Sequence, residues 1–231
     1  MRQALYTELS GIEERIIGDL DLAELTANGL AEVLADPSQP TPGFLERNAR
    51  RIRESARIAV ERLVLVLARQ APVAGDLRLV AALLQVTAHE ALIANQFDLI
   101  TEQLMEIDPD EPPEREIAAM LESMARLAAR EIHQAADALT ARDPEAAEEV
   151  ARADREINAL NRRVFAQAGR AIGSPARRAT SMHLMLIARS IERLGDNAVD
   201  IAEQAAFVAT GVYREFTDAS HPATSVPDTG T

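Results

Sequence analysis

The stretch LMLIARSIERLGDNAVDIAEQAAFV, residues 184–208, has the pattern of one long amphipathic helix. Its apolar residues recur alternately three and four positions apart: Leu184, Ile187, Ile191, Leu194, Ala198, Ile201, Ala205 and Val208. At about 100° per residue they form a stripe roughly 120° wide, which is the stripe that a bundle helix buries against its neighbours. The stretch therefore predicts an all-α fold in which this helix packs against others.

Four acids lie nearly opposite that apolar stripe, and we refer to them as the acidic series: Glu192, Asp196, Asp200 and Glu203. Like charges four positions apart on a helix repel by a few tenths of a kcal/mol per pair, so the series favours a compensating cation. One interpretation is a solvated surface in which Arg189 and Arg193 pair with these acids. The other is metal binding, because carboxylate oxygens are the ligands that hard cations and iron prefer.

The run RSIERLGDNAVDIAE, residues 189–203, resembles the signature helix of the PhoU family, where Glu-Arg-x-x-Asp-x-x-x-Asn/Asp precedes Ile-Ala-Glu. The run QAPVAGDLR, residues 70–78, is similar to the family's entry to its third helix. Residues 143–158 resemble the fifth helix, with Asp154 and Asn158 at the positions of a paired acid. The resemblance extends to about Val212. It implies an all-helical regulator of phosphate uptake whose acidic motif is associated with bound metal clusters.

Hydrophobic periodicity predicts six helices along the chain. Residues 83–107 repeat the apolar spacing of residues 184–208 after a shift of 101 positions, which indicates an internal duplication. Gly18 and Gly29 predict a bend or break in the first helix. The predicted helices are 2–35, 44–70, 73–107, 113–141, a fifth from Asp143-Pro144 to before Gly173, and a sixth from Ser174-Pro175.

The fold class that we expect is all-α, with six long helices forming two similar three-helix bundles. The predicted domains are residues 1–107, residues 108–213 and a disordered tail, residues 214–231, of which 216–231 should be dispensable for folding.

The first half of the chain lacks the acidic signature. The 101-residue shift places Ala91, Asn95 and Leu99 on Glu192, Asp196 and Asp200, and it places Arg53 on Asp154. We therefore expect any metal, iron or another divalent cation, at the sixth helix. Its ligands would be Glu192, Asp196 and Asp200, joined by Glu203 and Asp154. In the first half, Glu90 should be buried or paired across helices rather than a ligand.

Composition excludes several classes of function. The chain of 231 residues has a net charge of −13, no cysteine and no lysine. The charge disfavours nucleic acid and anionic membranes as partners, and the missing residue types exclude thiolate sites and lysine chemistry. The sequence also lacks Glu-x-x-His pairs, so we expect no di-iron enzyme and no other enzyme activity. Without a signal-like segment or a transmembrane run, a cytoplasmic protein is expected.

By resemblance, the protein would be a negative regulator of phosphate uptake and phosphate-starvation signalling. It would be a non-enzymatic adaptor, a homodimer, acting on a phosphate ABC transporter ATPase and on a phosphate sensor kinase at the inner face of the membrane. Two alternatives stay open at this point. One is an acidic helical scaffold that has lost phosphate control, and the other is a carboxylate-based metal-buffering protein.

Overall fold

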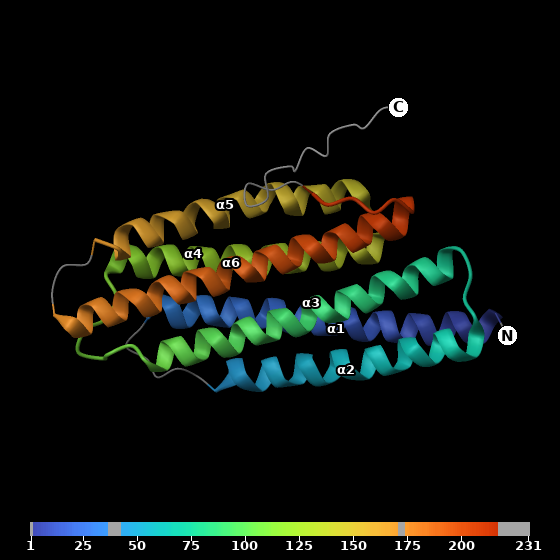
Figure 1. The fold of residues 1–231 in the computed structure, drawn as a ribbon, viewed down its shortest axis with the longest axis horizontal. Helices are drawn as coiled ribbons and strands as arrows, with labels where there is room; N and C mark the ends of the chain where they lie inside the picture. Colours follow the sequence, from blue (N-terminus) through green and yellow to red (C-terminus); the bar gives the residue numbers. More distant parts are fainter. Residues whose placement is uncertain (1, 37–42, 171–173, 217–231) are drawn as a thin grey trace, which may run out of the picture.

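The computed structural model describes residues 2–36, 43–170 and 174–216, and within these residues every regular element is an α-helix. This confirms the all-α fold with six helices (Figure 1). The helices are α1 (Arg2–Ala35), α2 (Phe44–Gln70), α3 (Gly75–Met105), α4 (Arg115–Ala141), α5 (Pro144–Ala168) and α6 (Pro175–Thr210).

The helices lie along the long axis of the molecule, α1 to α3 on one side and α4 to α6 on the other (Figure 1). Within each half the three helices pack against one another, as expected for a duplicated three-helix bundle. Contacts of α1 with α4 and of α3 with α6 join the halves, whereas α2 and α5 touch only helices of their own half. The buried apolar side chains form one cluster that runs through both halves. Both bundles thus share a single core.

Two helices begin at the caps that the sequence predicts. The Asp143 side chain accepts hydrogen bonds from the backbone N–H groups of Glu145 and Ala146, and the Ser174 hydroxyl accepts one from Arg177 N–H. A proline follows each cap at the first helical position, where its missing N–H has no intrahelical partner to lose. α5 ends at Ala168 rather than near Gly173, and residues 171–173 lie outside the described part of the chain.

The sequence predicts a bend or break in α1, and the break does not occur, because Arg2–Ala35 forms one continuous helix. Packing accommodates the polar and glycine positions within this helix. The buried Thr26 hydroxyl donates to the carbonyl of Leu22 and accepts from the Asn48 amide. A Cβ at Gly29 would come within 2.6 Å of the Phe44 ring, so the absence of a side chain allows that close contact. Tertiary contacts therefore outweigh the low helix propensity of glycine.

Among the described helices, α3 is long and apolar enough to cross a membrane by length and composition alone. Core helices of bundles meet the same criterion. In this structure α3 packs against α1, α2 and α6, and Val80, Leu83, Val86, Ile93, Phe97 and Ile100 are fully buried.

The predicted tail boundary needs a correction at Phe216. This residue packs partly buried against the core, and its backbone N–H donates to Glu203 Oε1 over 2.6 Å. Phe207 and Tyr213 also meet edge to face, with ring centroids 6.1 Å apart. Residues 211–216 therefore fold back along the end of α6. The rest of the predicted tail, residues 217–231, lies outside the described residues.

Candidate functional site

The acidic series does not form one solvated face. Glu192 and Glu203 are 3% and 5% exposed, whereas Asp196 is half-buried and the Asp200 side chain is 46% exposed. The expectation that all four acids face away from the packed side of the helix is therefore wrong. The reason is that α6 contacts three helices, α3, α4 and α5, so little of its circumference meets solvent.

Glu192 is held by its own helix. Both of its carboxylate oxygens accept from Arg189 Nη1, one turn earlier. Burial, and to a smaller extent the neighbouring Asp196, nevertheless raises the pKa of Glu192 to about 6. The self-paired interpretation is thus confirmed for this one acid, but the pair lies at the edge of the core rather than on an open surface.

Three helices meet at Gly195. A Cβ on this glycine would lie 2.7 Å from Glu131 Oε2 of α4 and 2.8 Å from Asp154 Oδ1 of α5. Asp154 is fully buried, and its other oxygen accepts from the Asn158 amide. Glycine therefore leaves room for two carboxylates beside the α6 backbone. The carboxylate predicted on the fifth helix thus lies next to the signature on the sixth.

Glu131 is a component of this cluster that the sequence interpretation missed. It is 1% exposed, and neither carboxylate oxygen has a hydrogen-bond partner. Burial and then the charge of Asp154 raise the pKa of Glu131 to about 9, with a smaller contribution from Asp196. The sequence held one indication that Glu131 is buried. This residue stands four positions after Leu127 and four before Ala135, in line with the buried face of α4.

Asp200 turns toward the other half of the molecule. Its carboxylate lies 3.4 Å from His89 Nδ1 of α3, and the same nitrogen is 3.0 Å from Asn197 Oδ1. One side chain of the first half thus contacts two residues of the signature. Glu203, one turn further on, accepts the Phe216 N–H and so belongs to the contact with the chain end.

The corresponding region of the first half has a different chemistry. Arg53, which the repeat places on Asp154, forms an ion pair with Asp98 of α3. Glu90 is 1% exposed, as expected, and burial followed by the charge of Asp19 raises its pKa well above the usual range. Both Glu90 oxygens lack a hydrogen-bond partner. A guanidinium and a buried acid without hydrogen-bond partners therefore replace the carboxylate pair of the second half.

The donor chemistry at Gly195 suits a hard cation, since it offers carboxylate oxygens, and those of Glu131 have no hydrogen-bond partner. The spacing of the acidic side chains suits a hard cation less well. Among the residues that the structure describes, no three His, Asp or Glu side chains are grouped closely enough to hold a metal ion. The acidic series is spread along α6, and its members have separate surroundings: Arg189, the Gly195 junction, His89 and Phe216.

Geometry and sequence together define a class, a duplicated three-helix-bundle protein with a partly buried acidic signature on its sixth helix. A family model described as the PhoU domain matches residues 121–205, which run from α4 to the end of the acidic series. The resemblance to the PhoU family is thereby confirmed, and the matched region is the half that carries the signature.

Curated relatives extend the similarity over most of the chain. The phosphate-specific transport system accessory protein PhoU homolog of Rhizobium meliloti (strain 1021) is 27% identical over 209 residues, 89% of this chain and 82% of that protein. The protein of the same name from Zymomonas mobilis is 27% identical over 218 residues, 90% of this chain and 88% of its own.

A solved structure shares the fold. The phosphate transport system regulatory protein PhoU from Streptococcus pneumoniae superposes with a TM-score of 0.78 at 17% identity, covering 91% of this chain and 99% of that one. At this identity the likeness concerns the fold. The chain therefore has the fold of a PhoU protein.

Proposed function

We propose that the protein is a PhoU-like negative regulator of phosphate uptake and of phosphate-starvation signalling. It would act as a non-enzymatic adaptor on the ATPase of a phosphate ABC transporter and on the associated sensor kinase, in the cytoplasm at the inner face of the membrane. The observation that carries the proposal is the acidic signature, in the geometry described above, inside a region that matches the PhoU domain. The printed names of the relatives, accessory proteins of phosphate-specific transport, support it.

A gene deletion tests this role. Cells without the protein should express phosphate-scavenging genes, and accumulate phosphate, while phosphate is abundant. Restoring the native gene should reverse both effects. Unchanged transcription and uptake in the deletion strain would contradict the proposal and favour an acidic scaffold without phosphate control. Affinity purification from membranes of the native strain then tests the two named partners.

We also propose metal binding at the second half, because Glu131 and Asp154 both approach Gly195 there, and repulsion from Asp154 and Asp196 contributes to keeping Glu131 from ionising. A divalent cation would relieve that repulsion. Asp196 and Asp154 would supply ligands, with Glu192, Asp200 and Glu203 as the further acids of the signature. Only the second half would hold a metal site. In the first half, Arg53 stands at the position of Asp154 and already pairs with Asp98.

Elemental analysis of purified protein tests the metal proposal. Native protein should contain iron or another divalent metal, and Asp196→Ala should contain less. The double variant Ala91→Glu/Asn95→Asp, which copies part of the signature into α3, measures whether the first half can regain a site. Equal, near-zero metal in native protein and in Asp196→Ala would overturn the proposal.

A further inference from the structure

A hollow of about 700 Å³ lies between α1 and α2, on the first half and away from the acidic signature. Volumes of this order are typical of small-molecule sites, which range from about 300 to 1,000 Å³. Residues of α1 from Arg15 to Leu25 and residues of α2 from Arg50 to Ile58 line it. The interactions of its polar residues identify the chemistry that it can accept.

Arginine supplies the positive charge in the hollow. Arg15, Arg50 and Arg51 all line it. In the described part of the chain none of the three forms an ion pair, although Arg53 and Arg57 of the same helix do. The Nε–H of Arg15 is buried and has no hydrogen-bond partner. None of the three guanidinium groups is therefore held by a carboxylate of the described residues in direct contact, in a chain whose net charge is −13. Guanidinium is also the side-chain group that best matches phosphate geometry.

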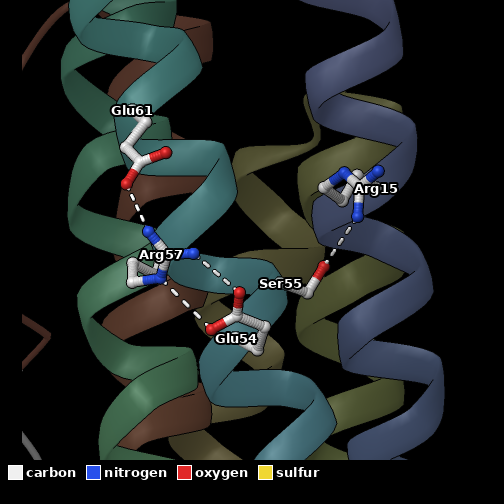
Figure 2. A network of polar contacts seen from close by, with 5 residues as sticks. All are labelled: Arg15, Glu54, Ser55, Arg57 and Glu61. Atoms are coloured by element: carbon white, nitrogen blue, oxygen red, sulfur yellow. Dashed lines mark hydrogen bonds and ion pairs between the residues drawn. The ribbon is translucent and has the colours of Figure 1, made fainter.

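Three acids also line the hollow, Asp19, Asp21 and Glu54. Arg57 holds Glu54 through two hydrogen bonds and also reaches Glu61, as Figure 2 shows. The Ser55 hydroxyl accepts from Arg15 Nη1 over 3.2 Å (Figure 2). Burial, the largest effect, raises the pKa of Asp19, while a hydrogen bond from Ser55 and the nearby charges of Arg15 and Arg51 act to lower it. Asp21 is exposed. With Glu54 paired to Arg57, the lining holds three arginines and two aspartates, which leaves an excess of positive charge.

Apolar side chains form the other part of the lining. Leu22 and Ile58 are half-buried, and Leu25 is 65% exposed although it is large and apolar. Inorganic phosphate would use only the arginines. A ligand that also covered these three side chains would need an organic body, and a planar base or a similar ring would gain the stabilisation of apolar burial.

We propose that the hollow between α1 and α2 binds an organic phosphate of about nucleotide size. Its phosphate groups contact Arg15, Arg50 and Arg51, and its organic part covers Leu22, Leu25 and Ile58. The inference goes beyond the proposed regulatory function and does not rest on it, because binding is measured on purified protein. A negative result in the deletion strain and a negative result here are therefore distinguishable.

Calorimetric titration of the full chain with ATP, ADP, AMP and orthophosphate, without added metal, tests the proposal. A nucleotide should bind, and orthophosphate should bind at least tenfold more weakly. Arg50→Ala/Arg51→Ala should weaken nucleotide binding at least tenfold, whereas Arg62→Ala, which removes an exposed arginine of α2 outside the hollow, should change it less than twofold. Asp19→Asn should strengthen binding, because it removes a negative charge beside the arginines.

A second measurement locates the ligand in the unmodified protein, so the test does not depend on how the variants fold. Hydrogen exchange with and without nucleotide should show protection at residues 15–25 and 50–58. The proposal is overturned if no nucleotide binds, or if orthophosphate binds as tightly. It is also overturned if the double variant binds normally, if Asp19→Asn weakens binding, or if protection falls elsewhere.

Discussion

Buried acids distinguish this protein at the scale of single residues. Glu90 and Glu131 are each 1% exposed and have no hydrogen-bond partner for either carboxylate oxygen. A buried ionised carboxylate is costly, so both groups favour the protonated form, and both pKa values are raised. One lies in each half, and each interacts with an aspartate: Asp19 in the first, Asp154 in the second.

Replacing Glu90 by leucine should stabilise the protein, by about 1–3 kcal/mol at pH 8, because it removes a buried polar group without partners. The pKa of Glu90 is raised in the folded state, so the folded protein binds more protons than the unfolded chain above about pH 4.5. The contribution of Glu90 to native stability must then fall as pH rises from that value toward the folded pKa. The gain from Glu90→Leu should therefore be larger at pH 8 than at pH 5. Urea unfolding at both pH values measures it, and an equal gain at both would contradict this explanation.

Gly195 gives a second prediction at this scale. A Cβ there would lie within 3 Å of two buried carboxylates, so Gly195→Ala should destabilise the fold by about 1–3 kcal/mol. Gly11 is the matched control, because it is also helical and a Cβ would meet nothing within 4 Å. Gly11→Ala should instead stabilise by about 0.5–1 kcal/mol. Thermal unfolding compares the two, and a stabilising Gly195→Ala would show that the carboxylates move aside easily.

At the scale of elements, the sequence predicts where helices lie better than which faces they bury. The prediction for α2, residues 44–70, matches the structure, because prolines and glycine delimit it on both sides. α3 is shorter than predicted by two residues at each end and α4 by two residues at its start, where proline and turn residues compete. The caps at Asp143 and Ser174 are local and were therefore predictable.

Burial of the acidic series was not predictable in the same way. Periodicity identifies the most apolar stripe of α6, but it does not give the number of neighbouring helices. Because α6 has three, Glu192 and Glu203 are buried on faces that look polar in the sequence. Glu131 was missed for the related reason that a carboxylate within an apolar series is ordinarily assigned to the surface.

The chain end gives a prediction at the element scale. A chain ending at Phe216 should retain the stability of the full protein, because it keeps the hydrogen bond to Glu203 and the partly buried ring. A chain ending at Val212 loses both, together with the Tyr213 contact, and should be less stable by about 1–3 kcal/mol. Chemical denaturation of the three chains gives the comparison. Equal stability for the chain ending at Val212 would show that residues 213–216 contribute nothing measurable.

At the scale of the whole molecule, duplication has produced two halves that are alike in fold and different in chemistry. The second half combines Glu131, Asp154 and the acidic series, whereas the first has the Arg53–Asp98 pair and an arginine-lined hollow. His89 contacts Asp200 and Asn197 across the boundary, and Arg142 pairs with Glu13 over 2.6 Å. Polar contacts as well as the shared core therefore connect the two halves.

The shared core predicts that the halves unfold together. Ile93 of α3 is fully buried in the cluster that both halves form, and Ile93→Ala should cost about 2–5 kcal/mol. α2 and α5 are the informative helices, because each touches only its own half. If unfolding is cooperative, Ile93→Ala should lower the opening free energy of slowly exchanging amides in α5 as much as in α2.

Hydrogen exchange followed by mass spectrometry measures both helices in one experiment, and Ile191→Ala in α6 provides the reciprocal variant, since Ile191 is equally buried. Circular dichroism during urea unfolding should show a single transition for native protein and for both variants. Loss of protection confined to α2 in Ile93→Ala, and to α5 in Ile191→Ala, would mean that the bundles unfold independently. The contacts of α1 with α4 and of α3 with α6 would then join two separate folding units, and the predicted boundary near residue 107 would be a thermodynamic one.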